Sequence, residues 1–241
     1  MKNCYFHLVP HIYIAQFRDQ VILLDTKNDA YTICSETFGN ILLGAASNKK
    51  LTQESFDALD SLLQAGILEK SNIPYPFYID QKPDSVGVSN IDWRLPLNEK
   101  KTPFSLSVFK ALWYLVKVNF YIKFLGFHRA IGLIQKAYKQ KRKYIITNHE
   151  NLDHLAGVVN KACLIYPSRT KCLEWAMTYI LMALQKGWKC NLEIGIQNYP
   201  FMAHAWVECD GKIIMDSQDL RSGLAIILNE PFRRFKVPPI V

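Results

Sequence analysis

The stretch PSRTKCLEWAMTYILMALQKGWKCNLEIGIQNYPFMAHAWVECDGKIIMD, residues 167–216, decides how the second half of this chain folds. Its first part predicts a helix, because apolar residues recur at helical spacing until a glycine that can end the helix. These residues are Leu173, Met177, Ile180, Leu181, Leu184 and Gly187. With Ser168 or Thr170 as the N-cap, Cys172 lies in the first turn of this helix.

The first turn of a helix is a setting in which a cysteine can become a nucleophile. Free N–H groups and the helix dipole favour negative charge there, and Arg169 and Lys171 add positive charge nearby. Because the thiolate is the reactive form of cysteine, Cys172 is a candidate nucleophile. The alternative interpretation is that Cys172 is a buried structural thiol. A base placed near the sulfur would favour the nucleophile over the structural thiol.

Two strands and a hairpin follow the helix. Residues 190–196 and 200–208 alternate in polarity, which is typical of half-buried strands. The Asp210-Gly211 pair predicts a hairpin turn, from which residues 212–216 return as a third strand. A histidine on the second strand and an aspartate at the end of the third can therefore approach each other.

The register of that hairpin decides whether His204 and Asp216 can meet. A two-residue turn pairs Ala205 with Asp216 and points the His204 and Asp216 side chains to opposite faces. A three-residue turn with a left-handed glycine bulge places Asp216 opposite His204 and pairs Glu208 with Lys212. The second register gains an attractive cross-strand charge pair worth roughly 0.2–1 kcal/mol, and we predict it.

In that register the three residues can act as a catalytic triad. His204 is the candidate general base, and later the acid that protonates the leaving amine. Asp216 would orient the imidazole and stabilise its charged form, and the Cys172 N–H is a candidate for the oxyanion hole. The histidines show no metal-ligand spacing and no glycine-rich phosphate loop occurs, so we expect neither a metal nor another cofactor.

Length and composition allow substantial globular structure. The chain has 241 residues, of which 49% are hydrophobic, so two modest domains or one large domain are expected. Its start lacks the apolar run of a secretion signal, and its six cysteines are scattered without a CxxC pair. We therefore expect mostly free thiols and a cytoplasmic protein.

The positive charge is concentrated in the middle of the chain. The formal net charge is +8, and residues 81–165 contribute 14 basic and 5 acidic groups to it. Such a segment could meet nucleic acid, an anionic membrane, an acidic peptide or a partner protein. Zinc-finger spacings and a basic-aromatic binding signature are both missing from the sequence, so we do not expect nucleic acid as a partner.

Residues 1–72 have the pattern of a small winged-helix-like domain. In chain order the pattern predicts strands at 12–17, 21–25 and 30–33, a helix capped by Ser35, a helix capped by Thr52 and a returning strand at 67–69. The second helix carries an apolar stripe of Phe56, Leu59, Leu62 and Leu63. Short strands with free edges can accept a guest peptide as one more strand.

A proline-rich linker is expected at 73–103, before a strongly apolar segment at 104–127. A transmembrane helix needs about 18 or more uninterrupted apolar residues. Lys110, Lys117 and Lys123 interrupt this segment, so we expect an amphipathic helix packed on the domain that follows. A peripheral contact with a membrane surface is the alternative.

Several of these motifs resemble a known family. Cys172-Leu173, Pro200-Phe201, the run Ala203–Glu208 and Asp216 resemble the transglutaminase-like leader peptidase of lasso-peptide biosynthesis. Residues 1–80 resemble, by pattern, the leader-recognition element of many ribosomal peptide pathways. Together they are similar to the fused form of the lasso-peptide B protein.

The resemblance implies an α+β fold with three parts. These are a winged-helix-like leader-recognition domain (1–72), a linker (73–103) and a transglutaminase-like, papain-like cysteine protease domain (104–241). The leader of a ribosomally made precursor would bind through Ala30, Tyr31, Thr32, Ile33, Phe56, Leu59 and Leu63. Cys172 would cut the leader–core bond, and an ATP-dependent lasso cyclase, for which the basic segment is a candidate contact surface, would take the core.

Two other functions remain open at this point. An acyl-transferring transglutaminase-like enzyme would use the same triad. A non-catalytic adaptor would present the precursor peptide without using Cys172. Replacing Cys172 with alanine separates the adaptor from either enzyme, and incorporation of a labelled amine separates transfer from hydrolysis.

Overall fold

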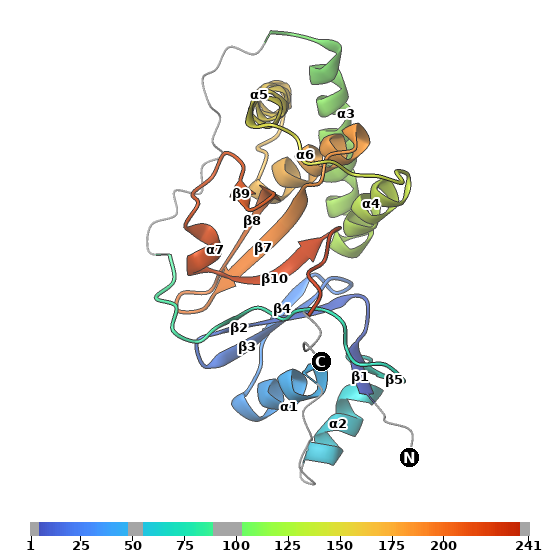
Figure 1. The fold of residues 1–241 in the computed structure, drawn as a ribbon, viewed down its shortest axis with the longest axis vertical. Coiled ribbons are helices and arrows are strands. Elements are labelled where there is room, and N and C mark those ends of the chain that lie inside the picture. The colour runs from blue at the N-terminus through green and yellow to red at the C-terminus, as the bar shows by residue number, and fades with distance from the viewer. Residues whose placement is uncertain (1–4, 48–54, 89–102, 237–241) are drawn as a thin grey trace.

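A computed structural model describes residues 5–47, 55–88 and 103–236, with the side chains of residues 55–57 left aside. The fold is a mixture of helices and antiparallel sheet, as expected for the α+β class. Figure 1 shows two lobes, a smaller one from the N-terminal part of the chain and a larger one from the C-terminal part. No helix within the described residues combines the length and the apolar character that crossing a bilayer requires.

The N-terminal lobe contains the strands and helices that the sequence predicts, together with a strand that it did not. Its elements are β1 (Tyr5–Leu8), β2 (Ile12–Phe17), β3 (Gln20–Asp25), β4 (Ala30–Ile33), α1 (Glu36–Ala46), α2 (Ser55–Gln64) and β5 (Leu68–Ser71). The unpredicted β1 pairs with the returning strand β5. Ser35 caps α1, since its hydroxyl accepts a hydrogen bond from the Phe38 N–H at 3.4 Å. Thr52, the expected cap of α2, lies outside the described residues.

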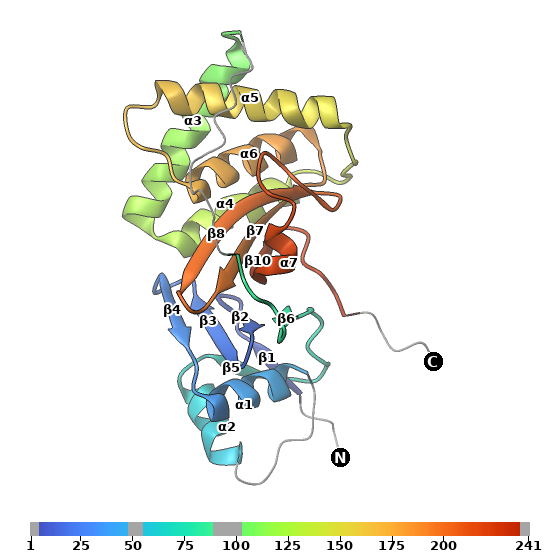
Figure 2. The same ribbon diagram turned by 90° about the vertical axis from the view of Figure 1, so that its left-hand side faces the viewer.

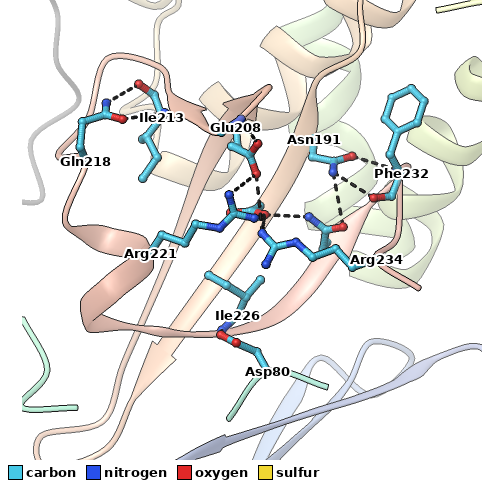
Figure 3. A network of polar contacts seen from close by, with 12 residues as sticks. Asp80, Asn191, Glu208, Ile213, Gln218, Arg221, Ile226, Phe232 and Arg234 are labelled. Atoms are coloured by element: carbon cyan, nitrogen blue, oxygen red, sulfur yellow. Dashed lines mark hydrogen bonds and ion pairs between the residues drawn. The ribbon is translucent and has the colours of Figure 1, made fainter. Parts of the chain in front are cut away.

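The first half of the expected linker is packed against the rest of the molecule. A short strand β6 (Gln81–Lys82) pairs with β2, giving a sheet of order β4-β3-β2-β6. The buried Asp80 carboxylate accepts a hydrogen bond from the Ile226 N–H at 2.7 Å, as Figure 3 shows. The segment before residue 89 therefore ties the two lobes together.

The two lobes share one hydrophobic core. One face of the N-terminal sheet packs on the C-terminal lobe and contributes Tyr13, Ala15, Phe17, Ile22 and Leu24 to it. The other face forms a separate core with α1 and α2. Because apolar side chains interdigitate across the junction, the position of β4 relative to the C-terminal lobe is fixed by packing.

The C-terminal lobe surrounds one buried helix. Its elements are α3 (Leu106–Phe120), η1 (a π-helix, Tyr121–Leu125), α4 (Phe127–Lys139), α5 (His149–Ile165), α6 (Cys172–Lys186), β7 (Asn191–Gln197), β8 (Met202–Cys209), β9 (Lys212–Ile213), α7 (Leu220–Gly223) and β10 (Ala225–Glu230). The antiparallel sheet has the order β10-β7-β8-β9. Helix α6 lies between this sheet and the other long helices, as Figure 2 shows.

Helix α3 packs as the sequence predicts, but along one side only. Its buried residues are Val108, Ala111, Leu115 and Val118, which face α5 and α6. The opposite side is also apolar and is exposed to solvent.

The expectation that the cysteines are mostly free thiols is wrong for two of them. Cys190 precedes β7 and Cys209 ends β8, and the two form a disulfide with Cα atoms 4.3 Å apart. The pairing follows from the adjacency of the two strands, which no spacing of cysteines in the sequence reveals. Cys34, Cys163 and Cys172 are the free cysteines of the described residues.

Candidate active site

Cys172 is the first residue of α6, at the helix end predicted from the sequence. The expected N-cap is wrong, because the capping position is Lys171 and not Ser168 or Thr170. The Lys171 N–H donates to the Glu174 carboxylate at 3.1 Å, which satisfies one donor at the helix start. The chain is extended at Lys171, so Cys172 enters the helix directly.

The structure brings Cys172, His204 and Asp216 together. His204 lies on β8 with 6% of its surface exposed, and its Nε2–H donates to Asp216 Oδ2 at 2.6 Å. The imidazole also hydrogen-bonds to the Cys172 thiol. The candidate nucleophile, the candidate base and the carboxylate that would orient the base are therefore hydrogen-bonded in sequence, an arrangement that can activate a cysteine.

The predicted turn register, however, is wrong. Cys209 pairs with Lys212, so the hairpin has a two-residue turn in which Asp210 and Gly211 have φ angles of 51° and 83°. Such double positive φ values define the type I′ turn, which fits the twist of the strands. The Glu208–Lys212 pair that favoured a bulge is not formed, since Glu208 lies opposite Ile213.

Asp216 reaches His204 by another route. Strand β9 ends at Ile213, and Met215 adopts a left-handed conformation with φ of 58°. The alternation of side chains between the two faces therefore stops before Asp216, whose carboxylate turns back toward β8. A two-residue turn would separate His204 from Asp216 only if the strand continued through residue 216, and the strand ends at Ile213.

The loop that carries Asp216 is held by a side chain that the sequence did not single out. The Gln218 carboxamide donates to the Ile213 carbonyl at 2.8 Å and accepts from the Ile213 N–H at 3.1 Å. It thus replaces a strand partner at the end of β9, as Figure 3 shows. Asp216 Oδ1 accepts from the Ser217 N–H at 2.8 Å, which fixes the rotation of the carboxylate.

The electrostatics of the site favour a thiolate–imidazolium pair. Burial raises the pKa of Cys172, but the His204 hydrogen bond and charge and the backbone N–H groups of Ala205 and Leu173 outweigh it, so that the pKa is lowered overall. Burial likewise lowers the pKa of His204, whereas hydrogen bonds to Asp216 and Cys172 raise it to about 9. Both shifts favour transfer of the proton from the sulfur to the imidazole, which gives the thiolate–imidazolium form.

A buried ionic cluster supports the sheet near the site. The Glu193 carboxylate on β7 is fully buried and accepts from Arg234 at 2.8 Å and from Arg221 at 3.2 Å. Arg221 also pairs with Glu208 on β8 at 3.0 Å. Figure 3 shows Arg221 and Arg234 converging on Glu208. Burial and the nearby Glu208 raise the pKa of Glu193 to about 8. The cluster joins β7, β8, α7 and the segment after β10.

The expected leader-binding strand lies next to the start of β8, the strand that carries His204. Strand β4 is the edge of its sheet, with Ala30, Thr32 and Ile33 exposed. Tyr31 is half-buried, and its ring centroid lies 5.3 Å from that of Phe201. Burial and the charges of Asp29 and Cys172 raise the pKa of Tyr31 to about 12, and Tyr31 and Cys172 both pack against the hydrophobic core that the two lobes share.

The expected leader-binding residues of α2 have different positions. Leu59 has 3% of its surface exposed and belongs to the core of the N-terminal lobe, so it supports the helix from beneath instead of facing a peptide. Leu63 is partly exposed at the edge of that core. The side chain of Phe56 lies outside the described residues.

The loop between β7 and β8 completes the surroundings of the site. The Gln20 carboxamide donates to the Tyr199 hydroxyl at 2.6 Å and also hydrogen-bonds to Asn198. With the Tyr31–Phe201 contact, these bonds bring the loop onto the N-terminal sheet. No local pattern predicts this contact, because its partners are separated by about 170–180 residues along the chain.

Two comparisons with known proteins show what this chain is similar to. The family model of the Transglutaminase-like superfamily matches residues 114–229, a range that includes Cys172, His204 and Asp216. The chain is also 22% identical over 217 residues to the Microcin J25-processing protein McjB of Escherichia coli, covering 89% of this chain and 96% of the relative. The resemblance that the sequence motifs indicated is confirmed by these two findings. No solved structure matches the chain.

Proposed function

We propose that the protein is a leader peptidase of lasso-peptide maturation. In this proposal residues 1–72 bind the leader of a ribosomally made precursor, and the domain at 104–241 hydrolyses the bond between leader and core. One observation carries the proposal: Tyr31, on the exposed edge of the sheet, contacts Phe201, three residues before the His204 that is hydrogen-bonded to Cys172. The similarity to a microcin-processing protein over most of both chains supports it.

The leader would enter as an additional strand on β4. An extended peptide bonds to an open sheet edge through its main chain, and the described residues place no strand beyond β4. The peptide would then pass the Tyr31–Phe201 pair and present its scissile bond to Cys172. Joining binding and cutting in one rigid unit raises the local concentration of that bond.

Cleavage would proceed through a thioester. The Cys172 thiolate forms a bond to the carbonyl carbon at the end of the leader, and the His204 imidazolium gives its proton to the amine of the core as the C–N bond breaks. His204 then takes a proton from water, whose oxygen attacks the thioester and releases the leader carboxylate and the thiolate. Asp216 holds the ring through both steps. The Cys172 N–H at the start of α6 is the candidate donor to the oxyanion.

The released core amine would be the substrate of the next enzyme. In this proposal an ATP-dependent lasso cyclase receives the core and joins its amine to a side-chain carboxyl. Both enzymes would meet the precursor in the cytoplasm, where it is made.

The experiment is incubation of the full chain with a leader-plus-core precursor, followed by mass spectrometry. We expect separate leader and core masses with the wild type and an uncut precursor with Cys172→Ala. Cys163→Ala is the matched control, because Cys163 is also a free cysteine but burial raises its pKa to about 11.

Two outcomes would replace the proposal with another function. Continued processing by Cys172→Ala would favour an adaptor that only presents the peptide. Incorporation of a labelled amine at the leader carboxyl, without free acid, would favour acyl transfer.

A further inference from the structure

The outward side of α3 and η1 is an exposed apolar face. Each of its seven side chains has between 43% and 88% of its surface exposed. They are Phe104, Leu106, Phe109, Trp113, Val116, Phe120 and Phe124, hereafter the α3 face. Figures 1 and 2 both show α3 at the periphery of the C-terminal lobe, so this face points away from the molecule.

The spacing of these residues makes the face continuous. From Leu106 to Phe124 they follow one another at intervals of three or four, which keeps them on one side of a helix. The side of α3 that packs on the protein is different and holds its own apolar residues. A helix that is apolar on all sides is normally buried, so one side of α3 lacks a partner in this chain.

The face is larger than the apolar patches of ordinary soluble surfaces. A fully exposed aromatic side chain presents about 150–250 Å², so the five aromatic residues at half to two-thirds exposure present on the order of 600 Å². Patches above a few hundred Å² mark sites of interaction with a protein or a membrane.

The charge around the face is positive throughout. Lys110 and Lys117 lie next to the apolar stripe on one flank, and Lys123 lies on the other. Lys161 of α5 covers the Phe104 ring, with its ammonium 4.6 Å from the ring centroid. Between residues 103 and 149 the sequence has nine lysines or arginines and no aspartate or glutamate.

We propose that the α3 face docks the protein onto an anionic lipid membrane. A lipid surface supplies both parts of the complement, an apolar layer for Trp113 and the phenylalanines and a continuous sheet of negative headgroups for the lysines. The face lies along one side of a helix at the molecule's periphery, which suits a flat interface. The helix would lie in the plane of the interface with its lysines at headgroup level.

The test uses the full chain and vesicles of equal parts phosphatidylglycerol and phosphatidylcholine, with pure phosphatidylcholine for comparison. We expect co-sedimentation with the anionic vesicles only, weakened by salt. The emission of Trp113 should shift to the blue on binding, and Trp113→Phe should remove that change. Reversing Lys110 or Lys117 to glutamate should lower the partition coefficient at least about fivefold each.

The decisive variant is Trp113→Glu combined with Phe120→Glu. It should lower the partition coefficient about 100-fold or more while leaving the circular dichroism spectrum and precursor cleavage unchanged. Val86→Glu is the matched control, because Val86 is an even more exposed apolar residue but lies in the segment next to α7. It should leave vesicle binding unchanged.

Three results would overturn the proposal. One is failure of the wild type to bind either kind of vesicle, and a second is equal binding by the double variant. The third is a concentration-dependent dimer in sedimentation velocity that the double variant abolishes, because the face would then be covered by a second copy of the chain. None of these results bears on cleavage, which the proposed function tests separately.

Discussion

Replacing Asp216 with asparagine should uncouple His204 from Cys172. The substitution keeps the size of the side chain and an acceptor oxygen, but it removes the negative charge 2.6 Å from the imidazole. The pKa of His204 rises from 6.5 to about 9, which at about 1.36 kcal/mol per pKa unit is a preference of roughly 3 kcal/mol for the charged ring. Asp216 and Cys172 share this effect, so losing one of them should lower the pKa by on the order of one unit or more.

The assay is the rate at which Cys172 reacts with iodoacetamide as a function of pH. In the wild type the hydrogen bond and charge of His204 lower the pKa of Cys172, so the thiolate should form at a lower pH than in a free cysteine. In Asp216→Asn the profile should shift toward higher pH, and the rate at pH 6 should fall about tenfold. Precursor cleavage should fall further, by roughly 10²–10⁴-fold, since the base also loses its orientation.

Asp219→Asn is the matched control for this experiment. Asp219 is exposed in the same loop and makes no capping hydrogen bond with its side chain, so its profile should equal that of the wild type. An alkylation profile unchanged by Asp216→Asn would refute the reasoning, because the aspartate would then have no influence on the charge of His204.

Three further predictions concern the elements that hold the site. Gln218→Ala removes both hydrogen bonds to Ile213 and should lower the free energy of unfolding by about 1–3 kcal/mol. In precursor cleavage, kcat should fall by a larger factor than KM rises, and equal factors would argue against a positioning role. Gly195→Ala would place a Cβ 2.5 Å from the Trp206 ring and should cost about 3 kcal/mol in urea unfolding, and an unchanged midpoint would contradict this packing. Folding raises the pKa of Glu193 to about 8, so the folded state holds a proton that the unfolded state loses above about pH 4.5. The free energy of unfolding should therefore fall from about pH 5 to about pH 8. Calorimetry at several pH values should show a flatter pH dependence for Glu193→Gln, and equal slopes in variant and wild type would contradict this assignment.

Much of the site could be predicted because it rests on local patterns. Helical spacing located α6 and put Cys172 in its first turn, and alternation located the strand that carries His204. The hairpin pattern brought Asp216 toward His204, although through a turn register that the structure does not have. These features depend on residues close together in sequence, whose geometry follows from the period of a helix or a strand.

The turn at residues 209–212 shows what local pattern cannot supply. The predicted register relied on a cross-strand charge pair worth a fraction of a kcal/mol. The observed two-residue turn matches the twist of the hairpin strands, and this preference outweighs the charge pair. The left-handed conformation of Met215 has no signal in its residue type, since methionine does not favour it. It is imposed by the contacts around it, among them the clamp of Gln218 on Ile213.

Long-range contacts account for the rest of what the sequence missed. The Cys190–Cys209 disulfide, the Tyr31–Phe201 contact and the docking of residues 73–88 all join segments that the fold brings together. The sequence pattern also did not predict that one apolar side of α3 is exposed. Periodicity identifies an apolar side of a helix, but a helix with two apolar sides gives no clear indication of which one is buried.

The central claim is that Cys172 cuts the leader from the core of a bound precursor. The most direct measurement is mass spectrometry of the precursor after incubation with the wild type, stopped early with iodoacetamide or acid. We predict free leader and core, with the leader transiently attached to Cys172 as a thioester in the acid-quenched sample. Full processing by the Cys172→Ala variant, or a covalent leader on any other residue, would contradict the claim.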